Sequence, residues 1–235
     1  VEPPSSAATI PRFGPDPTAD ILASATRNRP VLMGACCEAL LRIGSPAKSQ
    51  LMAGLRSGDH WIRYGCAWVL GRLGDQDVVP ELCRLLVTKD EKECVISQVA
   101  ESLAILGDSR AAPAAVRAME NTPMGPGGFS ALMKLLVEVE PTLASKWCVK
   151  LAQANQPAEL RSLATRIAGE LKDEASLRML VGAIHDSGQM EMVGLNACHS
   201  LGLRQARDAA VQLASIAEDK TRNAGTRVQT AWAIA

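Results

Sequence analysis

The stretch WIRYGCAWVLGRLGD, Trp61–Asp75, decides the fold, because its pattern recurs along the chain. CVISQVAESLAILGD (Cys94–Asp108) and VLMGACCEALLRIGS (Val31–Ser45) repeat an apolar helical face followed by Leu or Ile, Gly, and Asp or Ser. The marker glycine of these copies recurs about every 30 residues, as Gly44, Gly74 and Gly107, and a period of this size is typical of stacked helical units. Such units bury a continuous core only together with their neighbours.

Aligning the copies on the marker glycine as position 14 reveals the face that each helix would bury. Positions 6, 9, 10 and 13 follow the i, i+3, i+4, i+7 rule of an amphipathic helix. The glycine can adopt the left-handed conformation that ends a helix, and the Asp or Ser after it can cap the next helix. The pattern therefore predicts two helices per unit, no strand, and an all-α fold. Position 10 is apolar or small in every copy: Leu40, Leu70, Leu103, Ala168, Cys198 and Ile234.

The later copies are weaker, and the two ends of the chain differ from the rest. Glu159–Asp173 has Lys172 in place of the marker glycine, whereas Gln189–Leu203 restores it at Gly202. We expect residues 1–17, which contain five prolines, to form a linker or an ordered strap. Residues 18–235 should then form the repeat array, with its last repeat cut in mid-helix.

The combination R…A.WVLGRLGD..VVPELCRLL resembles a HEAT repeat of the bilin-lyase-like type, most clearly over Trp61–Thr122. The resemblance implies a right-handed α-solenoid of about six to seven helix-pair repeats, whose second helices usually line the inner face. The segment PMGPGG, Pro123–Gly128, departs from the pattern. We interpret it as an insert that bends the stack rather than a phosphate-binding loop, because it lacks the following Lys and the preceding strand.

Composition narrows the possible classes of function. The 235 residues carry 25 Lys and Arg against 25 Asp and Glu, and 47% are hydrophobic, which is ample for a core. This neutral balance argues against a generic nucleic-acid binder, which needs a basic footprint. No apolar run approaches the ~18 residues of a membrane span, so we expect no direct membrane insertion.

Seven cysteines, an odd number without a CxxC pair, favour reduced thiols over disulfides. Cys36, Cys66, Cys148 and Cys198 fall on positions expected to be buried, where Cys behaves as a small hydrophobe. Reduced thiols fit a reducing compartment, and the sequence thus predicts a cytoplasmic protein.

No recognisable metal or catalytic motif is present in the sequence. One HEAT-like hydroxylase family binds iron through His-Glu pairs, but His60, His185 and His199 are not followed by Glu. Metal sites need several converging nitrogen or oxygen ligands. We therefore predict no catalytic residues, no metal site and no cofactor, and a chain that is not an enzyme.

Arginine recurs at position 3 of the first helices, as Arg63, Arg161 and Arg227. HEAT-like families often use such an arginine to tie neighbouring repeats through an aspartate, and the resemblance therefore implies Asp75 and Asp108 as partners. This interpretation makes the arginines a structural ladder rather than ligand contacts.

A second basic series is the candidate interaction site. Arg84, Arg117 and Lys150 recur at one position of consecutive second helices, opposite the buried face of each helix. Stacking should align them into a partner-binding stripe that attracts an acidic segment of a protein partner. We thus predict a non-catalytic protein-interaction scaffold or adaptor. The open alternatives are a bilin-lyase-type subunit, a HEAT-like DNA glycosylase, and a structural module of a larger membrane-attached protein.

Overall fold

The computed structural model describes residues 31–89, 91–185, 191–203, 209–221 and 224–234. Those residues form helices and connecting turns and contain no strand, which confirms the predicted all-α fold. The predicted linker at residues 1–17 lies outside the described residues. The first helices of the successive units are, in chain order, α2 (Val31–Ile43), α4 (His60–Leu73), α6 (Glu93–Leu106), α8 (Pro126–Val139), α10 (Ala158–Ala168), α12 (Glu191–Leu203) and α14 (Ala224–Ile234).

The second helices form the other layer of the stack. They are α3 (Lys48–Gly54), α5 (Val79–Leu86), α7 (Ala112–Asn121), α9 (Pro141–Leu151), α11 (Glu174–His185) and α13 (Ala210–Glu218). Short 3-10 turns lead into α3, α5 and α7, at Ser45–Ala47, Gln76–Val78 and Ser109–Ala111. Proline stands in the first turn of α5 and of α7, where its missing N–H is not needed.

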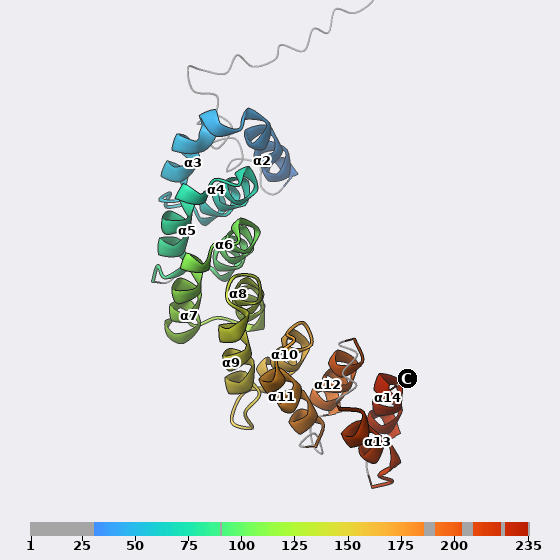
Figure 1. Cartoon of the computed structure of the whole chain (residues 1–235). Coiled ribbons are helices and arrows are strands. Elements are labelled where there is room, and N and C mark those ends of the chain that lie inside the picture. Colours follow the sequence, from blue (N-terminus) through green and yellow to red (C-terminus); the bar gives the residue numbers. More distant parts are fainter. Residues whose placement is uncertain (1–30, 90, 186–190, 204–208, 222–223, 235) are drawn as a thin grey trace, which may run out of the picture.

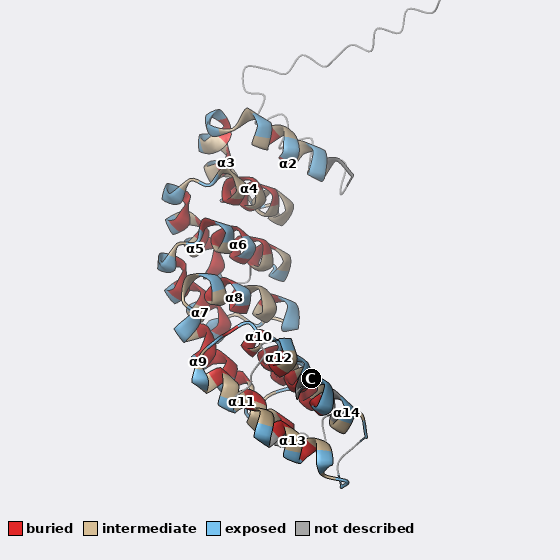
Figure 2. Ribbon diagram, turned by 45° about the vertical axis from the view of Figure 1, so that its right-hand side comes forward, coloured by how far each residue is buried: buried red, intermediate tan, exposed pale blue. Residues whose placement is uncertain are grey.

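The two layers form an elongated, bent stack, visible from two directions in Figures 1 and 2. The first helices lie on the inner side of the bend, and the second helices lie on the outer side. The expectation that second helices line the inner face is therefore wrong for this chain. Small residues explain the arrangement, because a Cβ built on Gly71 of α4 would lie 2.5 Å from Cβ of Ser102 on α6. Such close approach shortens the spacing of the first-helix layer and places it inside the curve.

The marker glycines end their helices as predicted. Gly74 and Gly107 are left-handed, with φ of 75° and 66°, and they terminate α4 and α6. Gly44 also has a positive φ of 73°. Asp108 then accepts a hydrogen bond from the amide of Arg110 at 2.8 Å, which confirms its capping role. Asp75 makes no such cap and instead binds the ammonium of Lys48.

The buried stripe is confirmed in the first three copies, where Leu40, Leu70 and Leu103 are at most 1% exposed. The alignment of α12 is wrong by three residues, because Gly202 lies within the helix instead of ending it. Ser200 of α12 donates to the carbonyl of Thr165 at 2.9 Å, as Ser102 donates to Ala67 at 2.8 Å. The rings of His199 and Trp232 also stack, with centroids 5.6 Å apart. Position 10 of α12 is therefore Leu201 rather than Cys198, although both are buried.

The cysteines are free thiols at every position of the sequence that carries one. Cys66, Cys148 and Cys198 are buried as predicted, but Cys36 is only half-buried, and its neighbour Cys37 points into the core. The Cys37 thiol lies 3.9 Å from the carbonyl of Gly65 on α4, so it faces the next unit. Burial raises the pKa of the Cys66 thiol to about 12. A thiol that stays protonated is a poor nucleophile, and this fits a structural role.

Candidate functional site

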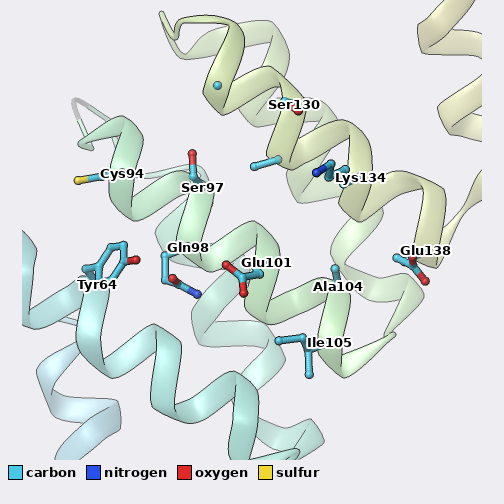
Figure 3. A pocket seen from close by; sticks show the side chains of 12 residues that line it. Tyr64, Cys94, Ser97, Gln98, Glu101, Ala104, Ile105, Ser130, Lys134 and Glu138 are labelled. Atoms are coloured by element: carbon cyan, nitrogen blue, oxygen red, sulfur yellow. The ribbon is translucent and has the colours of Figure 1, made fainter. Parts of the chain in front are cut away.

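A groove on the inner face crosses three consecutive first helices, α4, α6 and α8 (Figure 3). Its volume is about 830 Å³, within the range of sites that hold small molecules or peptide segments. We call it the inner groove. Its lining residues are Tyr64 on α4, Cys94, Ser97, Gln98, Glu101, Ala104 and Ile105 on α6, and Gly127, Ser130, Ala131, Lys134 and Glu138 on α8.

Equal positions of neighbouring units line the inner groove. Tyr64, Ser97 and Ser130 occupy one position of consecutive first helices, and Glu101 and Lys134 share another. Because stacked repeats place equal positions side by side, the groove is a product of the repeat rather than of one loop. Rigid helices supply its side chains, so their relative placement is set by helix packing.

The floor of the inner groove contains a fixed amide. Gln98 is only 3% exposed, and its Nε2 donates to Oγ of Ser102 at 3.4 Å. Ser102 in turn donates to the carbonyl of Ala67 at 2.8 Å. The Gln98 carbonyl oxygen makes no hydrogen bond to any described residue, which leaves it as an acceptor for a ligand. Burial, assisted by the charge of Glu101, raises the pKa of the neighbouring Tyr64, so the phenol stays protonated.

Charges of both signs flank this floor. Glu101 pairs with Arg72 at 3.2 Å, and the Arg72 guanidinium lies 3.9 Å from the ring centroid of Trp68. Lys134 and Glu138 are on α8, next to α6. Ile105 adds an apolar side chain that is 51% exposed. The groove can therefore bind a ligand that combines an apolar body with polar groups and at least one charge.

The sequence did not single out the inner groove. The signal was present, however, because Tyr64, Trp68 and Arg72 follow the i, i+4, i+8 spacing of one helical face. The shared position of Trp68 and Trp232 belongs to the same series. Reading positions 4, 8 and 12 down consecutive first helices would have outlined this surface.

The structure places the predicted basic stripe on the outer layer. Arg84, Arg117 and Lys150 lie on α5, α7 and α9, where they occupy equal positions of their helices. Arg84 pairs with Glu81 at 2.9 Å. The Lys150 ammonium lies 4.1 Å from the ring centroid of Trp147. Lys150 also lies 4.0 Å from Glu120, so carboxylates offset part of the positive charge at Arg84 and Lys150, and the role of the stripe in partner binding stays a prediction.

Two of the three position-3 arginines, Arg63 and Arg227, bind partners other than the aspartates that the resemblance implied. Arg63 pairs with Glu91, with 2.5 Å between Nη2 and Oε1, rather than with Asp75 or Asp108. It also donates to the carbonyl of Ser57 at 2.6 Å. Arg227 likewise donates to a backbone carbonyl, that of Ala217, at 2.9 Å. Arg63 therefore links the loop before its own helix to the loop before α6, whereas Arg227 contacts the last turn of α13.

The Gly-rich segment before α8 binds a carboxylate of the protein itself. Glu93 of α6 accepts hydrogen bonds from the amides of Gly125 at 3.1 Å and Gly128 at 2.7 Å. The donors that a phosphate would need are thus already satisfied, which supports the structural interpretation of this segment. Within the described part of the chain, no group of three or more His, Cys, Asp or Glu could hold a metal ion. None of the described helices has the length and hydropathy of a membrane span.

A family model of HEAT repeats matches residues 48–125. The fold of this chain is that of a HEAT-like repeat protein. The match begins at Lys48, the first residue of α3, and ends at Gly125, the residue before α8. No curated protein matches the sequence of this HEAT-like chain.

Two solved structures resemble the HEAT-like chain over nearly its full length. The complex of CpcE and CpcF of phycocyanin lyase from Nostoc sp. PCC7120 has 19% identity and a TM-score of 0.52, and the match covers 98% of each chain. Human deoxyhypusine hydroxylase in complex with glycerol has 15% identity and a TM-score of 0.40, with 92% and 94% covered. The first likeness supports the fold, and the second is too distant to carry an argument.

The likeness to the complex of CpcE and CpcF of phycocyanin lyase contradicts the prediction that the chain is not an enzyme. A solved structure with the same fold is a complex of chains of a phycocyanin lyase. A helical repeat array is therefore no argument against catalysis, and we withdraw the non-catalytic part of the sequence-based prediction.

Proposed function

We propose that this HEAT-like protein is a partner-binding subunit whose binding surface is the inner face of the solenoid, centred on the inner groove. The observation that supports this most directly is the convergence of equal positions from α4, α6 and α8 on one groove of about 830 Å³. A surface assembled by the repeat extends naturally to neighbouring units, so it suits a long ligand such as a segment of another protein.

The chemistry of the inner groove fits a protein segment. Ile105 and Tyr64 offer the apolar and aromatic contacts that dominate binding energy at interfaces. The free carbonyl oxygen of Gln98 can accept a backbone N–H of the segment. Lys134 and Glu138 at the rim can select its charges. The similar fold in a complex of two different proteins, CpcE and CpcF, is in line with this role.

The second candidate function is a bilin-lyase-type subunit that holds an open-chain tetrapyrrole. It is favoured by the combination of Glu101 and Lys134 at equal positions of adjacent helices, beside Tyr64. A carboxylate can accept the pyrrole N–H groups, an ammonium can pair with a propionate, and a phenol ring can stack on the pigment. Under this candidate the protein takes part in catalysis, together with a partner chain.

One set of variants tests both candidates. Ile105→Glu places a charge in the inner groove, whereas Val211→Glu changes a side chain of α13 that is 81% exposed and distant in sequence. Both proteins should fold, because both side chains already face solvent. We expect proteins captured from the native lysate by wild type to be retained by Val211→Glu and lost by Ile105→Glu. Equal capture by the two variants would refute binding at the groove.

The pigment candidate has its own readout, absorbance. Biliverdin added to the purified chain should show a shifted and sharpened long-wavelength band, and Lys134→Glu should weaken this binding. An unchanged spectrum would exclude the tetrapyrrole while leaving the protein-partner candidate to the capture experiment.

A further inference from the structure

A second cavity lies away from the inner groove, at the edge of the stack where α3 and α5 end. Its volume is about 590 Å³. Four cationic side chains line it: Arg56, Arg63, Arg84 and Lys89. We call it the cationic notch. Like charges repel, so a protein does not bring four of them together without a structural or functional reason.

One of the four cations is fully committed to the protein. Arg63 pairs with Glu91 through two hydrogen bonds, of 2.7 Å from Nε and 2.5 Å from Nη2. The Glu91 side chain is only 1% exposed. Arg63 and Glu91 therefore form a rigid, electrically neutral wall of the notch. The other three cations, Arg56, Arg84 and Lys89, determine its charge.

The remaining cations outnumber the carboxylates beside them. Arg56 and Arg84 share a single carboxylate, Glu81, at 2.8 Å and 2.9 Å. Among the described residues, Lys89 has no ion pair. Hydrogen bonds from Arg84 first, and from Arg56 second, lower the pKa of Glu81 to about 2, so this carboxylate stays charged between the two arginines. Counting the described residues alone, three cations face the single carboxylate of Glu81 and leave a surplus of positive charge.

The unused donors point to one class of ligand. Arg56 uses only Nε to bind Glu81, and Arg84 uses only Nη2. A guanidinium carries five N–H donors in a planar fork that matches a phosphate, so each arginine retains donors for a second anion. We infer that the cationic notch binds a phosphate group, held by Arg56 and Arg84 with Lys89 as an additional charge. The phosphate can belong to a modified side chain of a partner or to a free phosphorylated metabolite.

The repeat provides a matched control. Arg117 occupies the position of Arg84 one unit later in the chain. Its guanidinium is only 3.5 Å from the carbonyl of Pro113, and it lines neither of the two cavities. Changing Arg84 or Arg117 removes the same charge from the protein. Only the change at Arg84 removes that charge from the cationic notch.

The test is a titration of the full chain with pyrophosphate and, separately, with inorganic phosphate. Binding is measured by calorimetry and by changes in amide chemical shifts. We expect saturable binding with shifts around residues 55–57 and 84–89. Arg84→Gln should weaken it about tenfold, as for the loss of one charge-assisted contact, and Arg117→Gln should change it less than about twofold. Glu81→Gln should strengthen binding severalfold, because it removes the competing carboxylate.

The outcomes separate the proposal from its alternatives. No saturation, or equal weakening by Arg84→Gln and Arg117→Gln, would overturn the site and indicate a diffuse charge effect. Tighter binding of a phosphoserine peptide than of pyrophosphate would assign the phosphate to a protein partner, and the reverse order would assign it to a metabolite. A melting temperature unchanged by Arg84→Gln verifies that folding is not the cause.

Discussion

Gly71 and Gly169 occupy the same position in units that lie far apart in sequence, and each faces a serine of the following first helix. A Cβ on Gly169 would lie 2.7 Å from Cβ of Ser200, and one on Gly71 would lie 2.5 Å from Cβ of Ser102. Neither serine can move away easily, because its hydroxyl donates to the backbone carbonyl of the residue four positions before the glycine, Ala67 or Thr165. These pairs set how closely neighbouring first helices pack.

A glycine substitution should therefore have opposite effects at two helical sites. We expect Gly71→Ala to lower the free energy of unfolding by roughly 1–3 kcal/mol through overpacking. Gly182→Ala should raise it by about 0.5–1 kcal/mol, because nothing lies within 4 Å of the added methyl and Ala favours a helix. Urea denaturation checks both. A stabilising Gly71→Ala would mean that α4 and α6 are further apart than described.

The buried stripe gives a second prediction at the residue scale. Leu70 and Leu103 are both 0% exposed. Truncation of either to Ala should destabilise the protein by roughly 2–5 kcal/mol, since it removes buried methylene groups and leaves a cavity. Chemical denaturation measures the loss. A change below about 1 kcal/mol in either variant would contradict the packing of the first-helix layer.

At the scale of elements, the start of α8 depends on its neighbour α6. The N-cap residue Gly125 has no side chain to satisfy the first amides of the helix, and Glu93 supplies the acceptor from outside. Glu93→Ala should lower the free energy of unfolding by about 1 kcal/mol, as the loss of a helix cap does. Glu93→Gln should lower it less, because the amide oxygen can still accept a hydrogen bond. Amide exchange at Gly128 should accelerate in Glu93→Ala and stay unchanged in Glu138→Ala, which alters the far end of α8.

The contact between α9 and α11 is predicted to be sensitive to acid. Desolvation by burial would raise the pKa of Asp173, but hydrogen bonds from the Ser176 hydroxyl and amide and from Ser145 outweigh it and lower this pKa to about 2. A folded-state pKa below the unfolded value of ~3.9 stabilises the protein above that value, and this stabilisation is lost as the pH falls toward 2. Asp173→Asn should flatten the decline in the free energy of unfolding over this range. An identical pH profile in the variant would rule Asp173 out as its source.

At the scale of the whole molecule, the outer stripe and the inner groove are separate surfaces. The stripe residues Arg84, Arg117 and Lys150 lie opposite the buried faces of their helices, so changing all three to Glu should shift the melting temperature by no more than a few degrees. The same change should abolish capture of an acidic probe such as an oligoglutamate peptide, because it reverses the charge. Unchanged capture would remove the stripe as a binding surface, and a collapsed melting curve would make these residues structural.

Properties that depend on short stretches of chain can be predicted from the amino-acid pattern. The all-α fold follows from a helical period in every unit, and the helix ends at Gly74 and Gly107 follow from the need for a positive φ. Burial of Leu40, Leu70 and Leu103 follows from their place on the apolar stripe. Each of these is decided within one helix or one turn, so a local pattern is enough to predict it.

Features that depend on contacts between residues about one repeat unit apart could not be predicted from the sequence and are known only from the tertiary structure. Glu91 rather than Asp75 pairs with Arg63, because the loop before α6 passes closer to that guanidinium than the turn after α4 does. The three-residue shift in α12 is seen in the bond from Ser200 to the carbonyl of Thr165. The inner groove likewise exists because close packing places equal positions of α4, α6 and α8 side by side on the inside of the bend. A repeat period specifies which positions align, but side-chain volumes between the layers decide which layer lies inside and what the aligned positions enclose.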